Sequence, residues 1–301
     1  MTARTCLFVG SKRMGVRVLE TMLAEGREQV VGIVTFDDSA DARSALPSFV
    51  ELSRQTSLPL FVLKKGSEIR EVVLQTKPDF CVVSGWYWLL DQSLLDLCPG
   101  GFVGLHGSLL PRYRGFAPLV WALIEGESEL GISLFYFSEG MDEGDIIEQF
   151  PFTAGPDATI SEVLNEAEDA SVELIRRNFR PLVEGRAARS SQPASGANYC
   201  AQRVPSDGRI DWRWDAGRIH NFVRAQSAPY PGAFFADPRG QNVTVDAAEV
   251  FGAQYLGAPG QVLRSGPGYA LVICGGRSAI RIRFAEAVSL RFGERLASPI
   301  Q

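Results

Sequence analysis

Apolar and polar positions follow two different periods in the first half of the chain. Short and almost continuous apolar runs, such as TCLFVG at 5–10 and QVVGIVTF at 29–36, predict buried strands. Segments with helical spacing, such as MGVRVLETMLAEG at 14–26, separate them. Further strands are predicted at 58–63, 79–85, 101–106 and 131–137, and further helices at 48–56, 68–76, 93–98, 117–126 and 159–185. This alternation predicts an α/β fold, with a mostly parallel sheet covered by helices on both faces.

The pattern changes after residue 186. Residues 187–200 are rich in Ser, Ala and Gly, which is typical of a linker. Short β-like runs separated by turns follow, after one predicted helix at 216–226. They indicate a small β-barrel or sandwich, and we expect an OB-like barrel. The sequence thus predicts an N-terminal domain at 1–186, the linker, and a C-terminal β domain at 201–301.

Composition narrows the class of protein. Of the 301 residues, 46% are hydrophobic and 22% are charged, which is ordinary for a globular protein. No apolar run approaches the roughly 18 residues of a membrane span, and the first residues lack the features of a signal peptide. Five scattered cysteines without a C-x-x-C motif favour reduced thiols over disulfides or a zinc site. We therefore expect a cytoplasmic protein with no membrane contact and no metal.

The first candidate for a catalytic residue is His106, one of only two histidines in the chain. It lies in the segment FVGLHGSLLPRYRG, residues 102–115. Ligands of open α/β sheets bind outside the carboxyl ends of the strands, and His106 falls at one such predicted end. The acid-rich loop 138–142 follows another predicted strand. A carboxylate beside an imidazole fixes its tautomer, as general acid–base catalysis requires. A lone histidine at a strand end is more often structural, so spacing alone leaves both interpretations open.

Three longer motifs in the chain resemble those of a known enzyme family. LHGSLLPRYRG at 105–115 and EGMDEGDII at 139–147 resemble the signature of the folate-dependent formyltransferases. DGRIDWRWDAGRIHNFVRAQSAPYPGAFF at 207–235 resembles the C-terminal barrel shared by methionyl-tRNA formyltransferase and the amino-sugar formyltransferases, and it is most similar to the amino-sugar branch. The resemblance covers nearly the whole chain. It implies a Rossmann-like catalytic domain that moves a formyl group from N10-formyltetrahydrofolate, the co-substrate, to an amine.

The resemblance also implies roles for individual residues. His106 matches the catalytic histidine of the family, Asp142 matches its partner carboxylate, and Asp145 is expected to help hold the loop. The residues expected to bind the pterin of the co-substrate are Trp88, Leu89, Leu90, Ser138, Glu139, Gly140, Met141 and Asp142. For the aromatic run 86–88, packing beneath a loop is an equally good interpretation.

One position departs from the family pattern. The family has Asn-x-His at this strand end, whereas this chain has Gly104 two residues before His106. A side-chain amide that stabilises an oxyanion is typically worth about 3–4 kcal/mol. A water or another side chain could replace it, a more nucleophilic acceptor could need less help, or the protein could bind folate without transferring formyl. We expect an active enzyme in which Gly104→Asn changes turnover but leaves folate affinity nearly unchanged.

The acceptor is the remaining question. The loop 36–49 has three aspartates and one arginine, where the transfer RNA enzymes have a basic insertion. Such a loop would repel phosphates, and the net charge of −5 also argues against a nucleic-acid partner. The predicted acceptor is therefore a small-molecule amine, and a nucleotide-linked amino sugar is the best candidate. Arg203 or Arg224 could bind the diphosphate of such a sugar. N-hydroxyornithine, methionyl-tRNA, a non-catalytic folate-binding relative and a formate-releasing hydrolase remain alternatives, and a homodimer is compatible with all of them.

Overall fold

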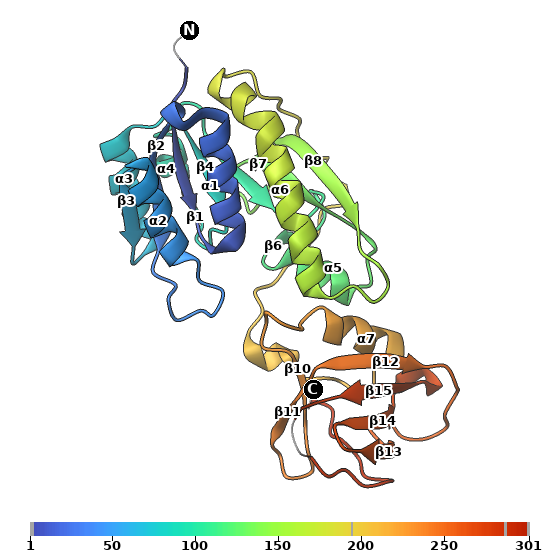
Figure 1. Cartoon of the computed structure of the whole chain (residues 1–301). Helices are drawn as coiled ribbons and strands as arrows, with labels where there is room; N and C mark the ends of the chain where they lie inside the picture. The colour runs from blue at the N-terminus through green and yellow to red at the C-terminus, as the bar shows by residue number, and fades with distance from the viewer. Residues whose placement is uncertain (1–2, 194, 286–287, 300–301) are drawn as a thin grey trace. The chain divides into compact units, whose positions relative to one another are not determined.

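The computed structural model describes residues 3–193, 195–285 and 288–299. In this part of the chain, the first half forms a seven-stranded sheet with the order β3-β2-β1-β4-β5-β7-β8 (Figure 1). Its strands are β1 (Cys6–Gly10), β2 (Val30–Phe36), β3 (Leu60–Leu63), β4 (Phe80–Ser84), β5 (Phe102–His106), β7 (Glu129–Tyr136) and β8 (Ile146–Thr153). The helices are α1 (Lys12–Gly26), α2 (Leu46–Thr56), α3 (Ile69–Thr76), α4 (Gln92–Leu95), α5 (Pro118–Ile124) and α6 (Ile160–Val183). The predicted α/β fold with a mostly parallel sheet is confirmed.

The alternation of side chains along β1 shows how the two faces are covered. Leu7 and Val9 pack into a core with α3 and α4 on one face. Phe8 points to the other face, where its ring stacks on Phe49 of α2 at 5.8 Å. Ion pairs join α1 to α6 on that second face, for example Arg13 with Glu168 at 2.8 Å. Because successive strand residues face opposite sides, one apolar run supplies both cores.

The segment 131–137 forms a strand, β7, but this strand is not parallel to β5 as expected. It runs antiparallel to β5, with Val103 opposite Tyr136 and His106 opposite Ser133. The carboxyl end of β7 therefore lies beside the beginning of β5, not beside His106. The connection between β5 and β7 contains one short helix and no crossover unit of the kind that parallel pairing needs.

The strand β8 has no clear strand pattern in the sequence and was not predicted. Pro151 interrupts its apolar pattern, and proline lacks the N–H that a central strand would use. β8 lies at the edge of the sheet, where a proline is tolerated. Two further short strands, β6 (Arg114–Gly115) and β9 (Tyr199–Cys200), pair with each other outside the main sheet.

The C-terminal region is an antiparallel β domain, as expected. In the described residues its strands form a four-stranded sheet, β12-β15-β14-β13, and a two-stranded sheet, β10-β11. The strands are β10 (Ala233–Ala236), β11 (Asn242–Val245), β12 (Ala247–Phe251), β13 (Val262–Gly266), β14 (Tyr269–Ile273) and β15 (Ala279–Arg283), and the helix is α7 (Ala216–Arg224). Asp215 caps α7 by accepting a hydrogen bond from the Arg218 N–H. Trp212 is completely buried and packs edge-on against Phe235.

The described chain divides into two compact units that are not simple halves. The first unit contains residues 1–118, 130–153 and 165–200, and the second contains 119–129, 154–164 and 201–301. The segment predicted to be a linker, 187–200, thus belongs to the first unit. No helix within the described ranges has both the length and the apolar character needed to cross a bilayer.

Candidate functional site

His106 is the last residue of β5 and is 8% exposed. Its Nε2 lies 2.7 Å from the main-chain oxygen of Tyr113. A carbonyl oxygen can only accept, so Nε2 is the nitrogen that bears the hydrogen in the neutral ring. Nδ1 is then left to accept a proton.

Asp142 lies beside that free nitrogen. Its Oδ2 is 3.5 Å from His106 Nδ1 and accepts a 2.7 Å hydrogen bond from the Gly115 N–H. The loop between β7 and β8 brings the carboxylate back to the end of β5, although β7 itself ends elsewhere. Asp142 has a φ of 55°, a left-handed conformation that aspartate adopts more easily than most residues. The two residues predicted to act together are therefore neighbours in space.

The loop after His106 is held by the polar side chains of Ser133 and Gln149, which were not predicted from the sequence. Ser133 Oγ donates to the Ser108 carbonyl at 2.6 Å and accepts from the Leu110 N–H at 3.1 Å. Gln149 Nε2 donates to the same Ser133 oxygen and to the Leu110 carbonyl. Both side chains come from neighbouring strands, and no sequence motif links them to the loop.

Phe137 fills the space beside Gly104. A Cβ placed on Gly104 would lie 2.3 Å from Phe137 Cε2 and 3.2 Å from Phe135 Cε1. The residue that follows β7 therefore occupies the position where a side chain at 104 would begin. An aromatic ring has no hydrogen-bond donor, so this neighbour does not replace a missing amide.

The aromatic run after β4 packs into a cluster around Phe36. The ring centroids of Trp86 and Trp88 are 4.8 Å apart, and that of Phe36 lies 5.0 Å from Trp88. Leu89 is 76% exposed, whereas Leu90 is buried in the core beneath α3 and α4. The three residues predicted to contact the pterin thus differ in exposure: Trp88 is 38% exposed, Leu89 is largely exposed and Leu90 is buried.

Some of the buried polar atoms without a hydrogen-bond partner lie near the same segments, whereas Arg209 Nε and Trp212 Nε1 lie in the C-terminal domain. Among the described residues, Ser84 Oγ, Trp86 Nε1 and Ser138 Oγ are buried without a hydrogen-bond partner. Buried donors normally find partners, so these atoms are suited to a polar ligand that completes them. Trp86 and Phe137, the neighbour of Ser138, pack against the same face of the sheet. Ser84 was not predicted as a site residue, although it directly follows the apolar run of β4. Trp86 belongs to the aromatic run 86–88, for which the sequence left pterin contact and packing beneath a loop equally open.

The rest of the loop 138–142 is less enclosed. Glu139 is exposed, while Gly140 and Met141 are half-buried. Met141 Sδ would lie 3.0 Å from a Cβ on Gly115, so the loop packs closely against β6. The neighbouring Asp145 accepts from the Tyr136 N–H through its main chain and lies 3.9 Å from Arg189, which agrees with a role in holding the loop.

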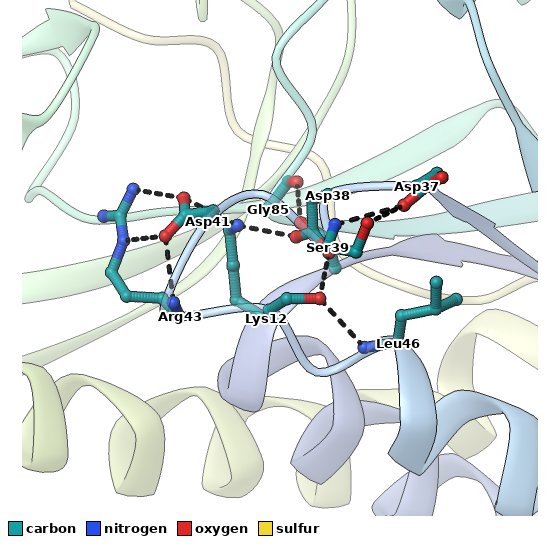
Figure 2. A network of polar contacts seen from close by, with 10 residues as sticks. Lys12, Asp37, Asp38, Ser39, Asp41, Arg43, Leu46 and Gly85 are labelled. Atoms are coloured by element: carbon teal, nitrogen blue, oxygen red, sulfur yellow. Dashed lines mark hydrogen bonds and ion pairs between the residues drawn. The ribbon is translucent and has the colours of Figure 1, made fainter.

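The acidic loop after β2 is less negative than its sequence indicates. Lys12 Nζ lies 2.6 Å from Asp38 and 2.9 Å from Asp41. Figure 2 shows the network of polar contacts to which these residues belong. Arg43 binds Asp41 through two guanidinium nitrogens. These hydrogen bonds, first from Arg43 and then from Lys12, hold the pKa of Asp41 well below its usual range despite partial burial. The predicted repulsion of phosphates by this loop is correspondingly weakened.

The two arginines predicted to meet a diphosphate already have partners within the C-terminal unit. Arg203 donates to Gln226 Oε1 at 2.6 Å and stacks over Trp121. Arg224 is 7% exposed and donates to the Ala158 carbonyl at 2.8 Å. Burial lowers the pKa of both guanidinium groups.

Neither a metal-binding group nor a disulfide is found among the described residues. Among the residues that the structure describes, no group of three or more His, Cys, Asp or Glu side chains is placed to hold a metal ion. The five cysteines are free and buried. Burial, and after it the charge of Asp142, raises the pKa of the Cys200 thiol to about 11.

Two family models match successive parts of the chain. Residues 5–178 match the family model "Formyl transferase", and residues 203–287 match "Formyl transferase, C-terminal domain". The chain belongs to the formyl transferase family. The predicted enzyme class, a transferase of formyl groups, is confirmed.

Individual relatives differ in their acceptors. The methionyl-tRNA formyltransferase of Symbiobacterium thermophilum is 33% identical over 92% of this chain and 86% of its own length. The structure of WlaRD, a sugar 3N-formyl transferase with dTDP and 5-N-formyl-THF, has a TM-score of 0.70 and 14% identity over 96% of this chain and all of that one. The N-formyltransferase of Helicobacter canadensis, with folinic acid and dTDP-3-aminofucose, has a TM-score of 0.68 and 15% identity over 94% of this chain and all of that one. At these identities the two structural similarities concern the fold alone.

Proposed function

We propose that this protein transfers the formyl group of N10-formyltetrahydrofolate to the amine of a small molecule, with a nucleotide-linked amino sugar as acceptor. The observation that supports this most strongly is the His106–Asp142 pair. A buried imidazole with one defined free nitrogen, 3.5 Å from a carboxylate, is suited to acid–base chemistry. The pair lies at the end of β5, where ligands of α/β sheets bind.

The formyl-folate would bind between the loop after β4 and the loop after β7. Ser84 Oγ, Trp86 Nε1 and Ser138 Oγ are buried polar atoms that a heterocycle with ring nitrogens and a carbonyl can satisfy. Trp88 would supply an aromatic surface beside them. Two solved relatives contain formylated folates, which agrees with this assignment.

The reaction requires one carbon–nitrogen bond to form and another to break. The neutral acceptor amine attacks the formyl carbon, and its nitrogen loses one proton. His106 Nδ1 takes that proton, and the Asp142 carboxylate stabilises the charged ring. The bond from the formyl carbon to N10 then breaks, and N10 receives the proton, so that tetrahydrofolate and a formamide leave.

Charge supports a small acceptor over a nucleic acid. The net charge is −5, and nucleic-acid binding usually requires a strongly basic surface. Methionyl-tRNA is the second candidate because a transfer RNA enzyme is 33% identical over nearly the whole chain, and because Lys12 and Arg43 neutralise part of the acidic loop.

A hydroxylamine such as N-hydroxyornithine is favoured by a different observation. The aromatic ring of Phe137 occupies the space beside Gly104, and it cannot donate to an oxyanion. A more nucleophilic acceptor needs less stabilisation of the tetrahedral intermediate. The nature of the acceptor therefore has to be tested directly.

Single-turnover transfer from N10-formyltetrahydrofolate, followed by mass spectrometry, distinguishes these functions. We expect formylation of a dTDP- or UDP-linked amino sugar, lowered by roughly 10²-fold or more in His106→Ala and unchanged in His220→Ala. Faster transfer to methionyl-tRNA or to N-hydroxyornithine would replace the proposed acceptor. Formate release without an acceptor would indicate a hydrolase. Binding of 5-formyltetrahydrofolate without any transfer would indicate a folate-binding protein.

We also propose a cytoplasmic location. All five cysteines are free, including Cys81 and Cys98, whose sulfurs lie 3.7 Å apart. Disulfides are rare in cytosolic proteins, so these free thiols agree with this location.

A further inference from the structure

The main chain of residues 113–115 holds both members of the His106–Asp142 pair. The Tyr113 carbonyl accepts from His106 Nε2 at 2.7 Å, and the Gly115 N–H donates to Asp142 Oδ2 at 2.7 Å. The orientation of both side chains therefore depends on where three backbone units lie.

This backbone has an unfavourable conformation. Tyr113 has a φ of 56°, Gly115 of 93° and Ala117 of 48°. A residue other than glycine is strained in the left-handed region, and such conformations persist only where surrounding contacts fix them. Only glycine fits at 115, because a Cβ there would lie 2.6 Å from the Cys200 carbonyl oxygen.

Residues 198–200 supply the fixing contacts. The Arg114 N–H donates to the Asn198 carbonyl at 3.0 Å, and the Phe116 N–H donates to the Cys200 carbonyl at 3.1 Å. Asn198 also accepts from the Tyr113 N–H through its side-chain Oδ1. Asn198 and the strand β9 thus hold β6 in place.

Gln192 connects the two halves of the site. Its Nε2 donates to the main-chain oxygens of Asp142 and Gly144 at 2.7 and 2.8 Å. Its Oε1 accepts from Arg114 Nε and Nη2 at 3.1 and 2.7 Å. Arg114 is 8% exposed and also donates to the Tyr199 hydroxyl at 2.8 Å. One amide therefore joins the Asp142 loop to β6.

We propose that Gln192 and Asn198, in the segment that the sequence presents as a linker, are positioning residues of the catalytic site. Asn198 keeps the Tyr113 carbonyl against His106 Nε2, and Gln192 keeps Asp142 against Nδ1. Two acceptors compete for the single hydrogen of the neutral ring: the Tyr113 oxygen at Nε2 and the Asp142 carboxylate at Nδ1. Loosening the first contact shifts the ring towards the tautomer protonated at Nδ1. Any effect of these residues on the rate of formyl transfer rests on the proposed function, whereas the tautomer of His106 can be tested without it.

The tautomer can be observed directly, because the chain has only two histidines. Long-range ¹H–¹⁵N correlation spectra of the full-length protein should show His106 protonated at Nε2. In Asn198→Ala the Nδ1-protonated form should appear. In Asn198→Asp, which keeps an oxygen acceptor for the Tyr113 N–H, the original form should remain. His220 lies in the other unit and should keep its signals throughout.

A wild-type His106 protonated at Nδ1 would overturn the proposal, and so would an Asn198→Ala spectrum identical to wild type. If the His220 signals also move, that variant has lost its fold, and Gln192→Glu decides instead. Glutamate retains the acceptor for Arg114 but cannot donate to the carbonyls of Asp142 and Gly144. The matched control is Gln202→Glu, because Gln202 is an exposed glutamine ten residues further along.

Kinetics give the second readout. We expect Gln192→Glu to lower kcat for formyl transfer by about 10- to 100-fold and to change KM for N10-formyltetrahydrofolate by less than about 3-fold, because misplaced catalytic groups slow the reaction more than they weaken binding. Equal kcat values in Gln192→Glu and Gln202→Glu would contradict the positioning role. If wild type transfers formyl to no acceptor, the proposed function fails, but the spectra still test the arrangement.

Discussion

Gly104 and Phe137 form a single feature of the site, although they are far apart in the sequence. Gly104 faces Phe135 across the β5–β7 pairing, and the Phe137 ring covers the same face two residues later. A Cβ at position 104 would meet that ring at 2.3 Å. The loss of a side chain at one position is thus coupled to a large ring at the other, so neither residue can be interpreted alone.

This coupling changes the expected effect of Gly104→Asn. We predict that the single substitution lowers the free energy of unfolding by about 1–3 kcal/mol, because the new side chain overpacks the site. In Gly104→Asn with Phe137→Ala, the loss should be smaller than the sum of the two single losses, since the residues are in contact. Urea unfolding of the four proteins measures this.

Gly155→Asn is a suitable control, because a Cβ there has open space around it. Additive losses would show that Phe137 does not fill the space beside Gly104. If the double variant folds, its turnover also tests whether an amide at position 104 speeds the proposed formyl transfer.

Among the secondary-structure elements, the loop after β2 is tied to the start of α1. Lys12 lies between Asp38 and Asp41, and the side chains of Lys12 and Asp38 are only 16% and 8% exposed. Arg43 closes the network from the far side of Asp41 (Figure 2). The loop is therefore fixed by a charged network and lies at the same edge of the sheet as the carboxyl ends of β1 and β2.

The pKa of Asp41 predicts how this network depends on pH. Hydrogen bonds from Arg43, opposed by partial burial and supported by Lys12, hold the pKa below the ordinary carboxyl value of 3.8. A depressed pKa stabilises the folded protein fully above that ordinary value and progressively less as the pH falls towards the lowered one. We expect Asp41→Asn to lose about 0.5–1 kcal/mol at pH 7, where the charged pair is intact.

Urea unfolding of wild type and Asp41→Asn at pH 7, 5 and 3 tests this dependence. The difference between the two proteins should be equal at pH 7 and 5 and smaller at pH 3. A difference that stays constant down to pH 3 would show that charge on Asp41 does not contribute.

Considered as a whole molecule, the chain does not divide where its sequence changes character. Residues 119–129 and 154–164 lie within the first family match but belong to the C-terminal unit. Within that unit, Trp121 Nε1 donates to the Ala201 carbonyl at 3.0 Å, and Arg224 donates to the Ala158 carbonyl. The two units are thus each built from separate pieces of sequence.

A truncation tests this arrangement. A fragment that ends at Cys200 should unfold roughly 10 °C below the full chain, because residues 119–129 and 154–164 lose the partners that cover them. Thermal unfolding by circular dichroism, with a dye that binds exposed apolar surface, measures the effect. An unchanged midpoint would mean that the first 200 residues form an independent domain.

The sequence predicted the parts of this molecule that depend on local pattern. Strands β1, β2 and β5 were expected within a few residues of their observed bounds, because they are continuous apolar runs. The His106–Asp142 pair was reached through a family motif. The direction of β7, the ring of Phe137 beside Gly104 and the contacts of Gln192 depend on tertiary pairing, which no local periodicity encodes.

The pairing of β6 with β9 has a consequence for biosynthesis. Arg114 and Tyr199 are separated by 85 positions, and closing such a long loop is entropically unfavourable and slow compared with local contacts. On the ribosome, His106 and Asp142 emerge long before residues 198–200. A growing chain therefore cannot complete the main-chain contacts that surround His106 until about two thirds of it has been translated.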